Sequence, residues 1–244
     1  MDFLKLVDAY TARARLLPGL LTVLPIAATV YAWDPGNPLG WNGLGGLLVG
    51  SGGTILLSFV ARDLGKEAEK RLYKKWGGRP TELAIMRSGS MDPMLRTRRL
   101  AAIHVVFPDV AIPTAAEETE DRDAVYQRLT AITKLLIARA RDKAKFALLF
   151  EELCNYGFRR NMFGMRWIGL SVSAITSIAL GLKVVGLFAS HSRLAVISLA
   201  IEAVNLAMLS AWIFWVNEKA VRQGSDLYAE RLFETLDTIP IAAR

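Results

Sequence analysis

Cysteine and histidine are scarce in this sequence of 244 residues, which holds one cysteine, Cys154, and two histidines. A single cysteine excludes an intramolecular disulfide framework and suits a reducing compartment. The histidines, His104 and His191, lie far apart, and no cysteine or histidine spacing typical of a metal site occurs. We therefore expect neither a metal nor a cofactor, and we interpret Cys154 as a small buried apolar side chain.

The sequence motifs of the common enzyme classes are also missing. There is no glycine-rich phosphate loop followed by its lysine, no nucleophile elbow and no histidine-based catalytic pair. These absences favour a protein that is not an enzyme, and we assign no catalytic residue. A membrane-embedded enzyme remains the alternative, and its turnover would fail when one polar residue was changed.

Long apolar runs are abundant, and 52% of the residues are hydrophobic. They are concentrated in four blocks of 18 to 24 residues: Leu16–Trp33, Gly43–Ala61, Trp167–Ser190 and Leu194–Val216. As helices these blocks would measure about 27–36 Å, enough to cross a hydrocarbon layer of about 30 Å. We predict an all-α membrane protein with four transmembrane helices. A signal peptide is the alternative for the first block, but only a short loop and another apolar block follow it.

The charges of the connecting segments predict the orientation. Three basic residues precede the first block, whereas the loop "DPGNPLGWN" after it carries none. Residues 62–166 carry 21 Lys and Arg against 14 Asp and Glu. Because basic segments stay in the cytoplasm, we expect two helical hairpins with both termini on the cytoplasmic side. The predicted parts are an N-terminal segment with the first hairpin (1–61), a basic helical cytoplasmic domain (62–166), the second hairpin (167–216) and a cytoplasmic helical tail (217–244).

Periodicity and capping signals predict helices in the cytoplasmic domain. The apolar stripe of the second block continues to Trp76, where Gly77 and Gly78 predict the end of a long helix. Thr114 and Glu117 have the spacing of a capping box. Five acidic residues near this start suit the helix dipole, with a divalent-cation site as the alternative. The apolar face of the segment that follows consists of Val125, Leu129, Ile132 and Leu136.

Polar residues interrupt the second predicted hairpin. Lys183 and Glu202 lie nine residues before and ten residues after Ser192, so an antiparallel hairpin would bring both charges to a similar depth. Each unpaired charge there would cost on the order of 3 kcal/mol. One interpretation is a structural pair between Lys183 and Glu202. The other is a water-filled path lined by Glu202 and Asn205, with Ser173 and Ser177 on the facing helix.

Two groups of basic residues belong to the cytoplasmic domain. We expect the arginines near the spans to set topology and contact lipid headgroups: Arg62, Arg159, Arg160 and Arg166. The second group lies far from the spans in sequence: Lys74, Lys75, Trp76, Arg79, Arg96, Arg98 and Arg99. It could bind a phosphate backbone and stack a base, which predicts steep salt dependence, or it could be a solvated surface.

Two stretches, "WGGRPTE" (Trp76–Glu82) and "LLFEELCNYGFRRNMFGMRWIGL" (Leu148–Leu170), resemble bacterial four-helix membrane effectors encoded beside nucleotidyltransferases in anti-phage defence. The similarity is to the membrane component of the Hailong system. More distantly, the layout resembles membrane effectors of cyclic-oligonucleotide signalling. The resemblance covers residues 76–170 and the layout of the spans, and it identifies no individual ligand-binding residue.

This resemblance implies a homo-oligomeric ion channel of the bacterial inner membrane, with four copies as a working number. Its ligand would be a nucleotide or single-stranded oligonucleotide made by the partner nucleotidyltransferase. In the Hailong case, the ligand would hold the channel shut until phage activity removes it. The active channel would depolarise the membrane and arrest growth. The alternative is a non-conducting membrane anchor or scaffold that recruits a cytoplasmic partner.

Overall fold

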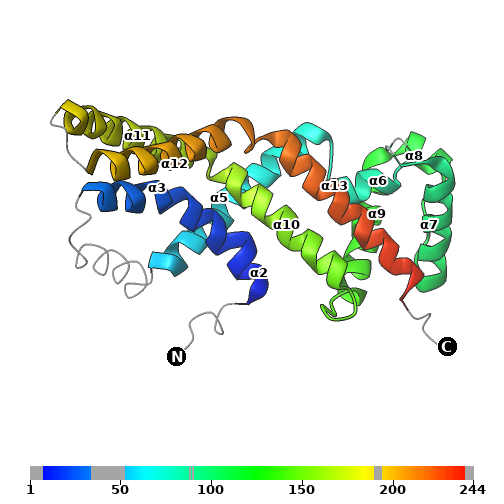
Figure 1. Ribbon diagram of the computed structural model, residues 1–244. Coiled ribbons are helices and arrows are strands. Elements are labelled where there is room, and N and C mark those ends of the chain that lie inside the picture. The colour runs from blue at the N-terminus through cyan, green and yellow to red at the C-terminus, as the bar shows by residue number, and fades with distance from the viewer. Residues whose placement is uncertain (1–7, 34–52, 88, 90, 190–193, 240–244) are drawn as a thin grey trace. The chain divides into compact units, whose positions relative to one another are not determined.

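The computed structural model describes residues 8–33, 53–87, 89, 91–189 and 194–239, and every regular element in these ranges is helical (Figure 1). The predicted all-α class is therefore confirmed. The elements in chain order are α2 (Ala9–Thr11), η1 (Ala12–Leu16), α3 (Leu17–Trp33), α5 (Gly53–Trp76), α6 (Pro80–Ile85), α7 (Pro93–Val106), α8 (Ala115–Glu120), α9 (Arg122–Arg139), α10 (Ala147–Gly164), α11 (Arg166–Ala189), α12 (Leu194–Phe214), α13 (Glu218–Glu234) and η2 (Thr235–Asp237).

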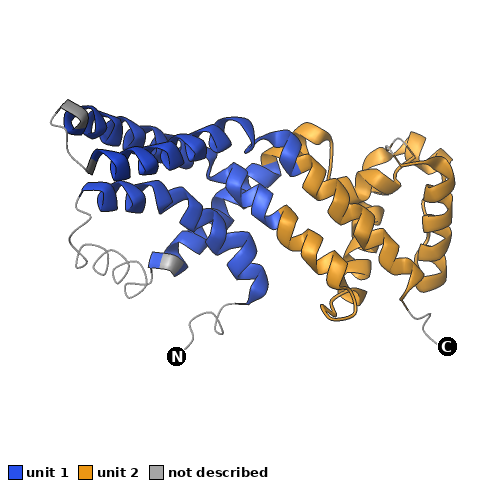
Figure 2. Ribbon diagram, viewed as in Figure 1, with its two compact units in different colours: residues 1–70, 157–221 blue, residues 71–156, 222–244 orange. Residues whose placement is uncertain are grey.

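The chain forms two compact units, which Figure 2 distinguishes by colour. Unit 1 contains residues 1–70 and 157–221, and unit 2 contains residues 71–156 and 222–244. Three long helices, α5, α10 and α13, contribute residues to both units. The C-terminal segment therefore shares a unit with residues 71–156, although the two are far apart in sequence.

Three helical stretches in the described part of the chain are long and apolar enough to cross a membrane. They are Ala9–Trp33, Arg166–Leu187 and Ala195–Phe214. They match three of the four predicted spans. Residues 43–52 of the remaining predicted span lie outside the described residues, and α5 begins at Gly53.

The three helices that could span a membrane bury their polar faces and expose their apolar ones. On α11, Ile175 and Leu182 are 67% and 72% exposed, whereas Ser173 and Ser177 are 0% and 7% exposed. A helix packed in water would show the opposite arrangement, because large apolar side chains gain most from leaving water. Lipid removes this difference, and small residues then favour close helix packing. The inverted pattern supports a membrane environment for unit 1.

Exposed aromatic side chains mark the ends of the spanning helices. Trp167, Phe214 and Trp215 are each at least 75% exposed where α11 begins and α12 ends. Trp33 is 53% exposed at the end of α3. Tryptophan concentrates at membrane–water boundaries because its ring is apolar and its N–H group is polar, so Trp33, Trp167 and Trp215 carry this indication. The helix from Trp167 to Lys183 measures about 24 Å at 1.5 Å per residue, close to a hydrocarbon thickness.

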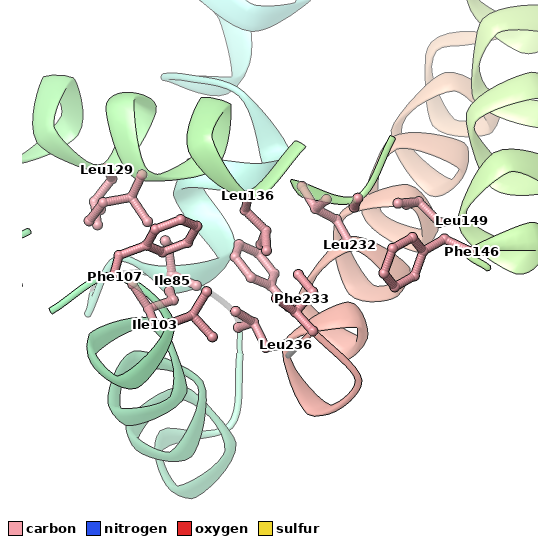
Figure 3. Close-up of a cluster of buried hydrophobic side chains, with 14 of the residues drawn as sticks. Ile85, Ile103, Phe107, Leu129, Leu136, Phe146, Leu149, Leu232, Phe233 and Leu236 are labelled. Atoms are coloured by element: carbon pink, nitrogen blue, oxygen red, sulfur yellow. The ribbon is translucent and has the colours of Figure 1, made fainter. Parts of the chain in front are cut away.

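Unit 2 has a conventional apolar core, which Figure 3 shows. The predicted α9 face is buried as expected, and its residues Val125, Leu129, Ile132 and Leu136 are 0–2% exposed. Ile103 and Phe107 join it from α7 and the residue that follows α7. Phe233 and Leu236, from the C-terminal segment, complete this side of the core.

Helix ends in unit 2 follow the sequence signals. The long helix α5 ends at Trp76, as predicted, and Gly77 and Gly78 have φ values of 77° and 148°, which favour glycine. Thr114 and Glu117 form the predicted capping box at the start of α8. Asp121 accepts a hydrogen bond from the backbone of Ala124 and thereby begins α9 as a separate helix.

Candidate functional site: a polar cluster inside the spanning helices

Asn205 on α12 is fully buried in unit 1 and connects two spanning helices. Its Nδ2 donates to Oγ1 of Thr29 on α3 at 3.0 Å. Its Oδ1 is buried without a hydrogen-bond partner in the described structure. An amide inside a bundle of spans therefore makes one interhelical hydrogen bond and keeps one acceptor free.

Three serine hydroxyls on the buried faces of α11 and α12 are also unpartnered. Ser173, Ser177 and Ser198 are at most 7% exposed, and their Oγ atoms make no hydrogen bond within the described residues. This is unusual in a spanning helix, where such hydroxyls commonly donate to the carbonyl one turn earlier. Thr176 does so at 2.9 Å to Val172. The three serines are instead left with unused hydrogen-bonding capacity.

Glu202 supplies the charge of this polar cluster, which we define as Ser173, Ser177, Ser198, Glu202 and Asn205. The Ser177 side chain lies beside the Glu202 carboxyl group. Oε2 of Glu202 is buried and makes no hydrogen bond within the described chain. Ser198, Glu202 and Asn205 share one face of α12, because they are spaced by four and three residues. Buried polar atoms of this kind are costly unless water or an ion satisfies them.

Of the two interpretations that the sequence left open, the structure does not show the pair between Lys183 and Glu202. Nζ of Lys183 donates to the carbonyl oxygens of Ala32 and Trp33 at 2.6 and 2.9 Å, and it lies 5.1 Å from the Trp33 ring centroid. The last carbonyls of a helix lack intrahelical donors and carry partial negative charge, so the end of α3 attracts an ammonium group. The similar depth of Lys183 and Glu202 in the sequence does not reveal these carbonyl oxygens of α3, which compete for the lysine.

Two clusters of buried apolar side chains involve the same helices as the polar cluster. Trp212 of α12 packs directly against Gly169 of α11, in a cluster with Ala61, Met165 and Val216. A second cluster joins α3, α11 and α12 and consists of Ala32, Leu180 and Val184, with Ile201 against it. Along α11, the polar positions 173 and 177 lie between Gly169 and Leu180. Ser173 and Ser177 therefore lie between two apolar clusters along α11.

The predicted juxtamembrane arginines contact the protein itself. Arg160 forms an ion pair with Glu69 at 3.1 Å, with side chains only 9% and 19% exposed. Arg159 and Arg166 donate to the carbonyls of Ala220 and Ile213 at 3.1 and 3.2 Å. Arg62 is partly buried, with its Nε unpartnered in the described chain. The expectation of lipid-headgroup contact remains a prediction.

Arg160 belongs to a close crossing of three helical segments in unit 1. Its Nε donates to Oδ1 of Asn161, whose Nδ2 donates to the Ala14 carbonyl in the π-helical turn η1. The buried Asn161 amide therefore links α10 to the π-helical turn η1. Gly65 of α5 lies against Asn161 and Gly164, so the backbones approach too closely for a side chain.

Two of the predicted polyanion-binding residues have structural roles in unit 2. Arg96 donates to the carbonyls of Arg87 and Met91 at 3.1 and 2.6 Å and thereby fastens the segment before α7. Arg99 is 8% exposed and stacks 5.6 Å from the Phe233 ring, and its burial lowers its pKa from the ordinary value. A phosphate ligand would have to disrupt these contacts. The structure therefore disfavours both residues as ligand contacts.

The other predicted residues divide between the α5 end and α7. Lys74 and Lys75 are exposed at the end of α5. Arg79 lies 3.7 Å from the buried carboxylate of Glu82. Arg98 of α7 forms a highly exposed ion pair with Asp237 at 3.5 Å.

Sequence reasoning missed the partners of Trp76. The Arg222 guanidinium lies 5.1 Å from the Trp76 ring, and Arg222 Nε also donates to both carboxylate oxygens of Asp226. Arg122 of α9 lies beside Gly77. No local signal connects these positions, because 146 residues separate Trp76 from Arg222 in the chain. One ring face of Trp76 is therefore already occupied, which leaves less room to stack a base.

No protein-family model matches the chain, and the searches of curated proteins and of solved structures gave no match either. The resemblance to anti-phage membrane effectors therefore stays a prediction from the sequence.

Proposed function

We propose that this protein is an ion-conducting membrane effector whose conduction path follows the polar cluster. The observation that carries this proposal is the set of buried, unpartnered oxygen atoms on α11 and α12 within an apolar exterior. Structural interhelical contacts would satisfy their hydrogen bonds, as Asn205 and Thr29 do. Oxygens left unsatisfied between helices suit a path that water and ions enter.

A fourth span follows from counting membrane crossings. The residues before α3 and residues 62–166 are both basic, so the charge rule places both in the cytoplasm. The chain must then cross the membrane an even number of times before residue 62. Among the described residues before position 62, α3 is the one helix that is long and apolar enough to cross the membrane. The apolar residues 43–61 supply the second crossing. In support, Leu56 and Phe59 at the start of α5 are 64% and 49% exposed, and Gly19 of α3 packs against Leu57.

The conducting form requires rearrangement and, we propose, several copies of the chain. Apolar clusters around Trp212 and Leu180 interrupt any path through one protomer. Dewetted apolar constrictions are a common form of channel gate. Closed rings of identical subunits generate a central axis along which the α11 and α12 faces could meet. We keep four copies as the working number.

Control by a nucleotide or single-stranded oligonucleotide remains part of the proposal, with a revised site. The exposed cations Lys74, Lys75 and Arg98 stay as ligand contacts, and Arg222 joins them beside Trp76. Ligand binding would bias unit 2 between two conformations by its different affinity for each. Because α5 is continuous from Gly53 to Trp76, one helix contains both ligand-contacting and membrane-proximal residues. In a bacterium, opening would depolarise the inner membrane and arrest growth.

Ion flux into proteoliposomes tests this function. We expect the purified protein to conduct in one of two conditions, with or without single-stranded oligonucleotide, and Ser177→Leu to reduce the flux about tenfold. Ser171→Leu is the matched control, because Ser171 lies on the same helix but is exposed. Correctly folded protein that never conducts, in either condition, would favour the alternative of a membrane anchor or scaffold.

A further inference from the structure

Glu202 is the one acidic residue in the described spans, since α3 and α11 contain none. Lys183 is the cation that the sequence places at a similar depth to Glu202. It contacts the carbonyl oxygens at the end of α3 instead. Among the described residues, no ion pair joins Glu202 to a cation. A carboxyl group inside a bundle of spanning helices needs either a positive partner or a proton, because an unpaired charge is poorly solvated there.

The buried side-chain atoms that make no hydrogen bond between positions 173 and 205 of the described chain are all oxygens. Oδ1 of Asn205 lies one helical turn from Glu202 on the same face, and the Ser177 side chain lies beside the Glu202 carboxyl group, whereas Ser173 and Ser198 lie further along the two helices. Three of these side chains, at positions 173, 198 and 205, are at most 1% exposed. The amide nitrogen of Asn205 is already used by Thr29, so its oxygen is the end left for a ligand. Carboxylate, hydroxyl and amide oxygens are the ligands preferred by hard cations.

The charge of the site selects a monovalent ion. Protein sites for Ca²⁺ use several carboxylates, whereas this cluster offers one. No group of three or more His, Cys, Asp or Glu side chains that could hold a metal occurs in the described chain, which argues against a transition metal. A proton on Glu202 is the competing explanation, because a neutral carboxyl group needs no counter-charge and its O–H can donate to one neighbouring oxygen. A bound monovalent cation would neutralise the carboxylate and contact several of these oxygens at once.

We infer that the polar cluster binds one alkali-metal cation, with the Glu202 carboxylate as charged ligand and oxygens of Ser177 and Asn205 as neutral ligands. This inference deepens the proposed function, because it names the class of ion that the path accepts. Binding and conduction are nevertheless separable, since a cation can occupy a closed bundle without crossing it.

The test measures binding without conduction. Purified full-length protein in lipid nanodiscs is heated in NaCl or KCl, with choline chloride keeping the ionic strength constant, and unfolding is followed by tryptophan fluorescence. We expect the unfolding temperature to rise with Na⁺ or K⁺ and to saturate, because a ligand that binds only the folded protein stabilises it. Glu202→Gln should abolish this rise. Glu67→Gln, which removes an exposed carboxylate of α5, is the matched control and should keep it.

Glu202→Asp provides a second variant that preserves the charge. We expect it to retain saturable stabilisation with at least tenfold weaker apparent affinity, because its carboxylate is one methylene further from the other ligands. Equal cation dependence in the wild type and Glu202→Gln would overturn the inference. So would stabilisation of the wild type that follows pH and is indifferent to Na⁺ and K⁺, since that result identifies a proton.

Parallel flux measurements separate this inference from the proposed function. Saturable binding lost in Glu202→Gln, combined with no flux in any condition, would support the cation site and reject the channel. Flux that Ser177→Leu reduces, combined with no cation-dependent stabilisation, would support the channel and overturn the site.

Discussion

Gly65 shows how a single position can be determined by its neighbours. A Cβ built on this α5 residue would overlap the side chain of Asn161 and approach its backbone at 3.0 Å. Asn161 cannot move away easily, because it is fully buried and its amide donates to the Ala14 carbonyl. Glycine therefore permits the close crossing of α5 and α10 in unit 1.

We predict that Gly65→Ala destabilises the protein by about 1–3 kcal/mol, the usual cost of overpacking a tight contact. The readout is the unfolding temperature in detergent or nanodiscs. Gly181→Ala is the control, because a Cβ on this α11 glycine meets nothing within 4 Å. Equal effects of the two substitutions would contradict the packing explanation and indicate a general effect of helix propensity.

Individual side-chain partners were the least predictable feature from sequence. The sequence left a pair between Lys183 and Glu202 as one of two interpretations, yet Lys183 donates to two carbonyl oxygens at the end of α3, about 150 residues earlier. Arg96 was one of the basic residues predicted to bind a polyanion, but its guanidinium donates to backbone carbonyls of the segment before α7. In both cases the competing acceptor is a main-chain oxygen. Such acceptors occur at every residue, so a pattern of side-chain types does not reveal them.

At the scale of helices, local signals were sufficient because local physics dominates. Glycines with positive φ end α5, and side-chain caps begin α7, α8 and α9. Apolar periodicity correctly identified the buried face of α9. In α11 the exposed face is apolar instead, and hydropathy indicated the span without indicating which face would be buried. Lipid removes the usual link between apolar character and burial.

The start of α8 gives a pH prediction. The pKa of Glu117 lies at about 2, mainly because the Thr114 backbone N–H donates to its carboxylate, with a further hydrogen bond from Arg128. A carboxyl whose pKa is lower in the folded state stabilises the fold above its unfolded pKa, about 4.3. We expect this contribution to be complete above about pH 5 and to disappear as the pH falls towards 2.

Thermal unfolding of Glu117→Gln against the wild type checks this sign. The wild type should unfold at a higher temperature above pH 5, and the difference should shrink between about pH 4.3 and pH 2. Glu120→Gln removes a carboxylate from the same helix outside the capping box and serves as control. A wild-type advantage that grew on acidification would show that the carboxylate is not stabilising as an anion.

At the scale of the whole molecule, the composition indicated helices that could span a membrane. It did not indicate that the C-terminal segment shares a compact unit with residues 71–156. Apolar blocks identified three helices able to span a membrane. The tail was expected to be a separate helical part, whereas Leu232, Phe233 and Leu236 lie in the core of unit 2. Their amphipathic pattern indicates a buried face but cannot identify the partner helix. The sequence identified four of the five residues of the polar cluster, Ser173, Ser177, Glu202 and Asn205, and missed Ser198.

Membrane topology provides the last prediction, because the number of spans decides where unit 2 lies. With four spans, residues 71–156 and the N-terminal residues share the cytoplasmic side. With three, α3 would place residues 71–156 outside the cell, and the hairpin of α11 and α12 would bring residues 222–244 to that same side. Both arrangements allow unit 2 to assemble, so its core does not distinguish them. Charge does, and the excess of basic residues in 62–166 favours four.

Single cysteines introduced by Asn37→Cys and Asp109→Cys test this difference with a membrane-impermeant maleimide. Asp109 is exposed in unit 2, and Asn37 belongs to the loop between the first two predicted spans. We expect intact spheroplasts to label position 37 and inverted vesicles to label position 109. The unmodified chain is the control, since its Cys154 is 1% exposed. Labelling of position 109 in intact spheroplasts would place unit 2 outside the cell, where neither a cytoplasmic nucleotide nor a partner nucleotidyltransferase could reach it.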